Sequence, residues 1–282
     1  MPSIAFLGTG LLGGAFVEAA LGRGETVTVW NRTAAKAVPL ASRGARVAAT
    51  PADAVRGVSR VHLVLQDDDS VEAVIAALRP GLGRDVPILD HTTTQPARTA
   101  VRASRLAAEG VRYLHCPVFI GPAMARQAQG TIMVSGPRAW FDAVQPALAS
   151  QAARVEYLGE RPDAAAVYKL CGNTLIVGIS GTVADMLAVA RGGGLSPDDA
   201  LRLFDFFDPS RIIGVRGRNM AAADFTPSFE LTMARKDVRL MLETAATQPL
   251  AVLPGLAARM DALIADGEGA RDLAVLGRDS VR

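Results

Sequence analysis

Three groups of residues in this sequence have types and spacings that suit chemistry. The first is Gly8-Thr9-Gly10-Leu11-Leu12-Gly13, which has the form GxGxxG and lies between an apolar stretch of strand length and a helix-like stretch. In this pattern the glycines permit a tight turn, close approach of a phosphate and close packing of the helix, whose N-terminus stabilises the anion. The segment predicts a dinucleotide site that uses Gly8, Thr9, Gly10, Leu11 and Leu12.

The second group, Asn31-Arg32-Thr33, follows the predicted strand Thr26–Trp30. NAD-binding sites usually place a carboxylate here, where it accepts hydrogen bonds from the ribose hydroxyls. Arg32 instead offers a planar cation to a 2′-phosphate, and Asn31 and Thr33 add neutral hydrogen-bonding groups. We therefore expect NADP(H) to be preferred over NAD(H).

The third group is Lys169 and Asn173, which are four residues apart and share one face of a predicted helix. Reducing a carbonyl needs a hydride on carbon and a proton on oxygen, and a lysine ammonium, with an unperturbed pKa of about 10.4, is a suitable donor. The surrounding segment is too apolar for an ordinary exposed lysine. We expect Lys169 to be the general acid or base, with Asn173 holding the substrate or the lysine in a cleft between two domains.

The elements expected around these residues form two domains. From Ile4 to Leu158, β-branched stretches alternate with alanine-rich stretches, which indicates a parallel sheet covered by helices. We predict a Rossmann-type, doubly wound, mainly parallel sheet over residues 1–162, with Leu65 at the cofactor. The predicted strands are Ile4–Leu7, Thr26–Trp30, Val61–Leu65, Pro87–Leu89, Tyr113–Val118, Thr131–Val134 and Val155–Leu158.

After residue 162 the alternation stops, and an all-α domain is expected over residues 163–282 for substrate binding and oligomerisation. The predicted helices are Ala164–Ala190, Pro197–Phe206, Phe229–Ala246 and Pro254–Asp266. The first of these is longer and more apolar than a small domain needs to bury. We therefore expect a homodimer or a higher homo-oligomer through the helical domain.

The composition argues against several classes of partner. Thirty basic residues balance 28 acidic ones without a long block of one sign, so we expect neither nucleic acid nor an acidic membrane as partner. Polar residues interrupt Leu175–Ala190, which predicts that it does not span a membrane. The N-terminus lacks the basic region of a secretory signal, so a cytoplasmic location is expected. No ligand-like spacing of cysteine or histidine occurs, so no metal is expected, and His62, His91 and His115 are interpreted as structural.

With its motifs in this order, the sequence resembles the β-hydroxyacid dehydrogenase family, which includes 3-hydroxyisobutyrate and 6-phosphogluconate dehydrogenases and glyoxylate and succinic semialdehyde reductases. The resemblance covers nearly the whole chain. Asp90–Pro96 is similar to the family's segment beside the nicotinamide, and Lys169-x-x-x-Asn173 to its catalytic motif. Cys116–Gly121 stands where the family carries Pro-Val-Ser-Gly-Gly, and Phe229 with Lys236-Asp237 resembles its C-terminal elements.

The resemblance implies an NADPH-dependent oxidoreductase that transfers a hydride between the nicotinamide and a small aldehyde, semialdehyde or hydroxy acid. It implies that Thr94 and Lys236 contact the cofactor. It assigns six residues to the substrate: Thr92, Phe119, Ile120, Gly121, Phe229 and Asp237.

The sequence departs from the family at Phe119 and Ile120, where serine and glycine bind the substrate carboxylate. Phe119 removes a hydroxyl donor, and Ile120 adds a side chain where glycine lets an anion approach the backbone closely. A small hydroxy acid is therefore less strongly indicated as the substrate. One alternative is an imine reductase-like enzyme, a related group that usually carries aspartate or tyrosine in place of the lysine. Lys169 argues against it, and Tyr168 keeps it open. Another is a non-catalytic NADP(H) sensor or oligomerisation module, whose expected signature is loss of the lysine.

Overall fold

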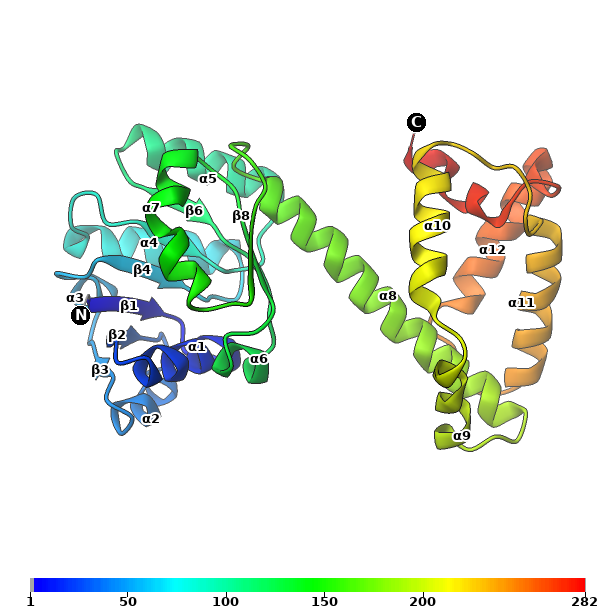
Figure 1. The fold of residues 1–282 in the computed structure, drawn as a ribbon, viewed down its shortest axis with the longest axis horizontal. Helices are drawn as coiled ribbons and strands as arrows, with labels where there is room; N and C mark the ends of the chain where they lie inside the picture. Colours follow the sequence, from blue (N-terminus) through cyan, green and yellow to red (C-terminus); the bar gives the residue numbers. More distant parts are fainter. Residues whose placement is uncertain (1–2, 282) are drawn as a thin grey trace. The chain divides into compact units, whose positions relative to one another are not determined.

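The computed structural model describes residues 3–281 and divides into two compact units, Met1–Asn173 and Thr174–Arg282 (Figure 1). The division falls within one long helix, α8 (Ala164–Gly192). The start of α8 coincides with the expected change from alternating elements to helices. Because the first unit reaches Asn173, both Lys169 and Asn173 belong to it.

A six-stranded parallel sheet forms the centre of the first unit, in the order β3-β2-β1-β4-β5-β6. This is the Rossmann-like arrangement that the sequence predicts. The strands are β1 (Ser3–Leu7), β2 (Thr26–Trp30), β3 (Arg46–Val47), β4 (Arg60–Leu63), β5 (Ile88–Asp90) and β6 (Tyr113–His115). The helices between them are α1 (Leu11–Gly22), η1 (Ala34–Lys36), α2 (Val38–Ala41), α3 (Pro51–Ala54), α4 (Asp68–Leu78), η2 (Arg79–Gly81) and α5 (Pro96–Ala108).

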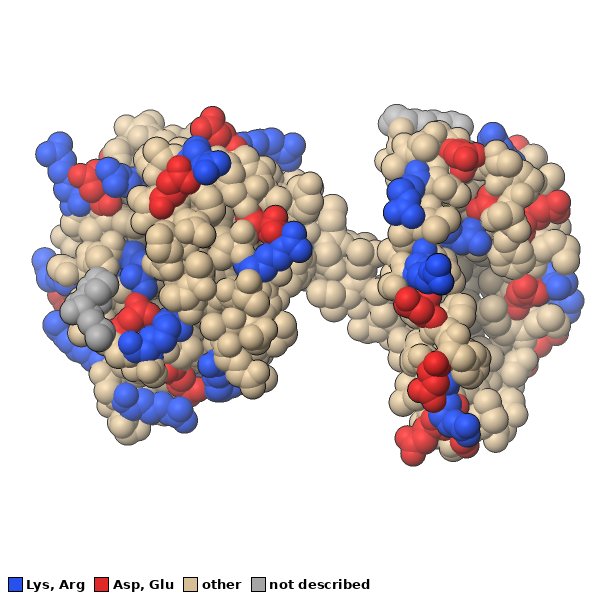
Figure 2. Space-filling model, viewed as in Figure 1, with Lys and Arg blue, Asp and Glu red and all other residues tan. Residues whose placement is uncertain are grey.

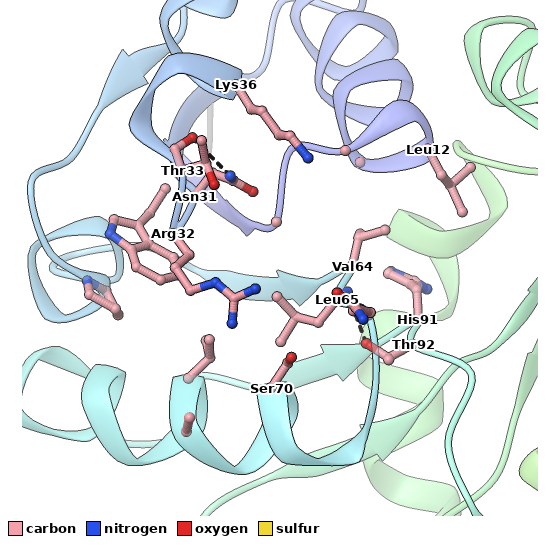
Figure 3. Close-up of a pocket in the computed structure, with 18 of the residues that line it drawn as sticks. Leu12, Asn31, Arg32, Thr33, Lys36, Val64, Leu65, Ser70, His91 and Thr92 are labelled. Atoms are coloured by element: carbon pink, nitrogen blue, oxygen red, sulfur yellow. Dashed lines mark hydrogen bonds between the residues drawn. The ribbon is translucent and has the colours of Figure 1, made fainter.

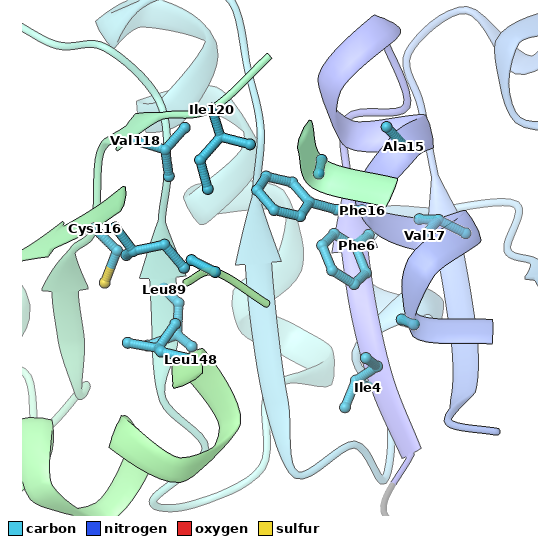
Figure 4. Packing of buried hydrophobic residues seen from close by; sticks show 14 of the residues in the cluster. Ile4, Phe6, Ala15, Phe16, Val17, Leu89, Cys116, Val118, Ile120 and Leu148 are labelled. Atoms are coloured by element: carbon cyan, nitrogen blue, oxygen red, sulfur yellow. The ribbon is translucent and has the colours of Figure 1, made fainter. Parts of the chain in front are cut away.

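Both faces of the sheet are buried, because successive side chains of each strand point to opposite sides. In β1, Ile4 and Phe6 join the cluster that contains Phe16 of α1, and Figure 4 shows the two phenylalanines in the same layer. Ala5 and Leu7 join a second cluster, which α3 and α4 cover. Alternating residues of one short strand therefore bind two helical layers to the sheet.

The predicted strand Tyr113–Val118 is wrong in one respect, because the structure breaks it into two strands of different sheets. β6 ends at His115, and β7 (Val118–Phe119) pairs antiparallel with β8 (Thr131–Val134), which pairs parallel with β9 (Arg154–Tyr157). Proline has no N–H for a sheet ladder, and Pro117 lies at the break. Two helices accompany this small sheet, α6 (Pro122–Arg126) and α7 (Arg138–Ala149).

The second unit is all-helical, as expected, with some different bounds. It contains the rest of α8, α9 (Pro197–Leu201), η3 (Arg202–Asp205), α10 (Pro209–Ala221), α11 (Leu231–Ala245), α12 (Leu253–Leu263), a π-helical turn (Ile264–Glu268) and η5 (Leu273–Ser280). The sequence reading missed α10 and η5. Leu231, Ala234 and Val238 of α11 pack with α12 and η5 in one buried cluster.

Two buried aspartates hold loops of this unit in place. The Asp185 carboxylate accepts hydrogen bonds from the backbone N–H groups of residues 251–253. Asp272 accepts from the N–H groups of Ser228 and Phe229 and pairs with Arg216. Burial by itself raises the pKa of Asp272, but the hydrogen bonds outweigh this effect and hold the pKa well below its usual range.

By length and composition alone, α8 is able to cross a membrane. The polar interruptions in Leu175–Ala190 therefore do not by themselves exclude a span, contrary to the sequence reading. Core helices of soluble proteins meet the same criterion when they are mostly buried, but only 6% of the most apolar window of α8 is buried within the chain. Asp185 in α8 binds protein backbone. Residues 170–184 of α8 include no Lys, Arg, Asp or Glu, and Figure 2 shows this stretch in tan.

Candidate active site

The glycine-rich turn joins β1 to α1 at the carboxyl edge of the sheet. Gly8 has φ of +99°, and a Cβ there would lie 2.1 Å from the backbone oxygen of Val64. A Cβ on Gly13 would lie 2.0 Å from the backbone oxygen of Gly8, so side chains are excluded at both positions. A Cβ on Gly10, the N-cap of α1, would meet nothing within 4 Å. The turn thus leaves open space at a helix N-terminus, as a pyrophosphate requires.

A pocket of about 590 Å³ extends from this turn along the carboxyl ends of the strands (Figure 3). Its volume lies in the range of small-molecule and cofactor sites. Its walls include the predicted residues Gly8, Gly10, Leu11, Leu12, Asn31, Arg32, Thr33, Leu65 and Thr92. They also include Trp30, Lys36, Val64, Gln66, Ser70, His91 and Thr93, which the sequence reading did not assign to a site.

The end of the pocket beside β2 is cationic. Figure 3 shows the guanidinium of Arg32 and the ammonium of Lys36 directed into it, with Ser70 on the facing helix α4. No aspartate or glutamate lines this pocket among the described residues. Two cations and a hydroxyl fit a phosphate better than a ribose hydroxyl pair. The spacing Arg32-x-x-x-Lys36 was the available signal for Lys36, whereas Ser70 comes close only through the fold.

Asn31 has a supporting position in the pocket wall. Its side-chain oxygen accepts a hydrogen bond of 3.0 Å from the backbone N–H of Thr9, and its amide nitrogen donates to the carbonyl oxygen of Thr33. Asn31 therefore ties the glycine-rich turn to the loop after β2. Both polar atoms of the Asn31 side chain bind protein backbone. Arg32 is therefore the residue of this loop that offers its side chain to a ligand in the pocket.

The other end of the pocket lies at the loop after β5. The Thr92 hydroxyl accepts from the backbone N–H of Leu65, and the backbone N–H of Thr92 donates to Asp90. Thr94 is turned inward, where its hydroxyl contacts Thr99 and His115, and Thr93 lines the pocket instead. The structure thus places Thr92 at the pocket and Thr94 beneath it.

Lys169 and Phe119 meet within the first unit. The Lys169 ammonium lies 4.4 Å from the centre of the Phe119 ring, a cation–π distance. The same ring lies against α8 at Gly172, where a Cβ would come within 2.1 Å of Phe119 Cζ. Burial lowers the pKa of the Lys169 ammonium from its usual value. The result is a half-buried lysine with weakened proton affinity beside an aromatic face.

The structure packs Ile120, which the sequence assigns to the substrate, among core residues, and its assignment stays a prediction. Its side chain is 9% exposed and belongs to the core cluster beneath the sheet, where Figure 4 shows it near Val118. Successive side chains along an extended segment point to opposite sides. Val118 and Ile120 point into the core, so Phe119 points away from it, toward Lys169. Gly121 is the N-cap of α6.

Phe229, Lys236 and Asp237 lie in the second unit. The Phe229 backbone N–H is held by Asp272, and its side chain is 36% exposed. The ammonium of Lys236 lies 3.0 Å from the Asp237 carboxylate, and both side chains are half exposed. Their assignment to cofactor and substrate stays a prediction.

Residues 3–159 match the family described as the NAD binding domain of 6-phosphogluconate dehydrogenase, which is more than half of the chain. The chain belongs to this family.

Similar proteins extend the comparison beyond the first unit. Glyoxylate/succinic semialdehyde reductase 1 of Arabidopsis thaliana is 28% identical over 257 residues, 88% of either chain. An imine reductase from Myxococcus stipitatus, in complex with NADP+, has a TM-score of 0.89 at 22% identity and covers 98% of this chain and 99% of its own. A reductive aminase from Aspergillus terreus has a TM-score of 0.87 at 26% identity, with full coverage of both chains.

These findings confirm the family and the fold that the sequence predicts. The protein is an NAD(P)-dependent oxidoreductase of the superfamily that holds β-hydroxyacid dehydrogenases and imine reductases. The glycine-rich turn and the pocket beside it fit the family's cofactor. The contact between Phe119 and Lys169 depends on Phe119, which stands where the family that the sequence resembles carries serine.

Proposed function

We propose that this chain is an NADPH-dependent reductase of carbon–nitrogen double bonds, in which Lys169 supplies the proton. The observation that carries the proposal is the contact between Lys169 and Phe119. The dehydrogenases that this chain resembles bind a substrate carboxylate through a serine hydroxyl. This chain has the aromatic ring of Phe119 at that position. The likeness to imine reductase and reductive aminase structures supports the same choice.

The cofactor preference rests on the cationic end of the pocket. NADP differs from NAD by a 2′-phosphate, and Arg32 and Lys36 offer it two charge-assisted partners. Ser70 on α4 adds a hydroxyl. No carboxylate lines this pocket among the described residues, although Asp67 lies close enough to Arg32 to interact with it electrostatically.

The substrate class follows from the surroundings of Lys169. A small carboxylate at Phe119 would lose a hydrogen-bond donor and face apolar surface, which costs free energy. An uncharged imine with apolar substituents has no such cost. Burial also brings the pKa of Lys169 closer to that of an imine nitrogen, and proton transfer is most efficient when donor and acceptor are matched.

The residues then have distinct tasks. Bound NADPH supplies a hydride to the carbon of the double bond. The Lys169 ammonium donates a proton to the nitrogen, and the Phe119 ring holds the ammonium and excludes water. Asn173, four residues further along α8, holds the substrate nitrogen or the lysine from the same face.

Reduction of a carbonyl is the second candidate. It is favoured by Lys169 itself, because a lysine is the proton donor that the β-hydroxyacid dehydrogenase motif supplies. The similarity to an Arabidopsis semialdehyde reductase supports it as well. The two candidate functions share the cofactor and the proton donor. They differ in whether Phe119 disfavours small substrates that carry a carboxylate.

A homodimer is the assembly that we propose. Leu175, Ile176 and Val177 of α8 have exposed fractions of 53%, 54% and 71% within the single chain. Exposed apolar side chains gathered on a stretch of helix without charged residues, as in residues 170–184, are typical of a surface that a second chain covers.

The role of Phe119 in substrate choice is tested by Phe119→Ser, with Phe119→Leu as the matched control. The serine variant restores a hydroxyl donor and should raise kcat/KM for a small semialdehyde acid about tenfold, the equivalent of one hydrogen bond of about 1.5 kcal/mol. The leucine variant keeps an apolar surface and should show no gain. Efficient turnover of semialdehyde acids by the unmodified protein, without a gain in Phe119→Ser, contradicts the proposal.

A further inference from the structure

A second cavity lies at the opposite edge of the parallel sheet from the cofactor pocket. Ser59, Pro87 and Arg112 immediately precede β4, β5 and β6, and Arg60 is the first residue of β4, so these residues mark the amino edge. The cavity has a volume of about 380 Å³. One face of α7 covers it with Trp140, Ala143, Val144 and Ala147. Ligands of such folds ordinarily bind at the carboxyl edge, so this cavity is separate from the cofactor site.

The walls of the cavity combine two arginines with an apolar plate. Arg112 pairs with Asp85, also in the wall, at 2.8 Å. Arg60 is the more informative residue, because its side chain is only 9% exposed. One terminal nitrogen pairs with Glu25 and Nε donates to His62, while the other terminal nitrogen has no hydrogen bond to any residue from 3 to 281. This free nitrogen is open to solvent at the cavity, so it can donate a charge-assisted hydrogen bond to an anion there.

Arg60 is also the first member of a hydrogen-bonded chain through the core. Its Nε donates to His62 Nε2 at 3.1 Å, so that nitrogen must be an acceptor. His62 Nδ1 then carries the proton and donates to His91 Nε2 at 2.9 Å. His91 Nδ1 in turn donates to the carbonyl oxygen of Cys116 at 2.7 Å. Burial lowers the pKa of His91 to about 4, which keeps the imidazole neutral as the chain requires.

The chain ends at the cofactor pocket, because His91 is part of its wall (Figure 3). The rings are also stacked, with centroids 4.4 Å apart for Phe6 and His62 and 5.2 Å apart for His62 and His91. Each hydrogen bond in the chain has a single possible direction. The chain thus connects Arg60 at the amino-edge cavity with His91 in the wall of the cofactor pocket.

We propose that the cavity at the amino edge is an effector site for a small aromatic carboxylate, and that its occupancy changes cofactor affinity through Arg60, His62 and His91. The carboxylate pairs with the free edge of Arg60 and with Arg112, and the aromatic ring lies against Trp140. Coupling between the sites is reciprocal, so the cofactor changes the affinity for the effector by the same factor.

The probe is benzoate, with the uncharged isostere benzamide as its control. The chain has two tryptophans, Trp30 in the cofactor pocket and Trp140 in this cavity, so the fluorescence of a Trp30→Phe protein reports on the surroundings of Trp140 and not on the cofactor pocket. Trp140 also borders a smaller neighbouring pocket, and the Arg112→Gln variant assigns the response to this cavity. We expect a saturable change in Trp140 fluorescence with benzoate and none with benzamide. In the unmodified protein, saturating benzoate should shift the Kd of NADPH about fivefold, the lower limit of common coupling strengths.

Three variants separate the parts of the proposal. Arg112→Gln should weaken benzoate binding at least about fivefold, whereas Arg84→Gln, an exposed arginine outside the cavity, should not. His62→Phe keeps a stacked ring but breaks the hydrogen-bonded chain, so benzoate should bind and no longer change the Kd of NADPH. No saturable response, an equal response to benzamide, an unweakened Arg112→Gln protein, or an unchanged Kd of NADPH would each overturn the proposal. Because the Arg112 side chain is half exposed, Arg112→Gln should fold, and it still tests benzoate binding if His62→Phe does not fold.

Discussion

At the scale of single residues, the cofactor pocket shows what spacing can and cannot predict. Gly8, Gly10 and Arg32 were found because their types are tied to fixed positions after a strand. Lys36 was missed although its spacing from Arg32 was an available signal, and Ser70 was missed because it reaches the pocket only through the fold. Ile120, which the sequence assigns to the substrate, follows β7 and packs in the core, a position that the residue type alone did not indicate. Thr94 also points inward, where it meets Thr99 and His115.

Arg32 is the residue on which the cofactor preference depends. Arg32→Gln removes the cation but leaves the loop, so the Kd of NADPH should rise about ten- to a hundredfold, which corresponds to a charge-assisted hydrogen bond of about 1.5–3 kcal/mol. The Kd of NADH should stay within about twofold. Arg43→Gln, an exposed arginine that does not line the pocket, is the control and should change neither value. Equal weakening of both cofactors would show that Arg32 does not read the 2′-phosphate.

At the scale of elements, the site depends on how β7 meets α8. The break at Pro117 frees Val118–Phe119 from the main sheet and pairs it with β8, which puts Phe119 against the first turns of α8. The sequence predicted that Lys169 and Asn173 share a helix face. It did not show that Gly172, on the same turn, leaves the room that the Phe119 ring fills.

Gly172→Ala tests this contact, and Gly178→Ala on the same helix is its matched control. A Cβ at Gly172 would lie 2.1 Å from Phe119 Cζ, whereas one at Gly178 would meet nothing within 4 Å. Because the ring is a movable side chain, Gly172→Ala should fold but displace Phe119 from Lys169 and lower kcat about tenfold or more. Gly178→Ala should keep its kcat and gain about 0.5–1 kcal/mol of helix stability. Equal kcat in both variants would mean that the ring has no part in the reaction.

At the scale of the whole molecule, the order of the two units was predictable and their detailed bounds were not. Alternation of strands and helices up to Leu158 and long helical periodicity afterwards define the two kinds of unit. The helix α10 was missed because Gly214 and Gly217 lie inside it, and glycine disfavours a helix interior. The 3-10 segment η5 was missed because it depends on contacts such as that of Asp272 with Arg216. The break between β6 and β7 was missed although Pro117, which has no N–H for a sheet ladder, was an available signal.

The exposed face of α8 gives a prediction about assembly. In light scattering at micromolar concentration, the protein should have twice the chain mass of 29.5 kDa. Val177→Glu places a charge at a position that is 71% exposed in the single chain, so it should not disturb the fold but should weaken the dimer. A monomeric unmodified protein, or a Val177→Glu dimer of unchanged stability, contradicts the assembly that we propose.

The most direct test of the central claim compares kcat/KM for a preformed cyclic imine with that for the cyclic ketone of the same ring size, with NADPH and no added amine. We expect the imine to exceed the ketone at least about a hundredfold. Lys169→Met should lose about 10²–10⁴ in kcat on the imine while its Kd for NADPH stays nearly unchanged, which is the usual contribution of a positioned acid. In the unmodified protein, activity should fall as pH rises through the pKa of Lys169, below the value of about 10.4 for a free lysine, because burial lowers that pKa. Turnover of the ketone that equals or exceeds that of the imine, or full activity of Lys169→Met, would contradict the account.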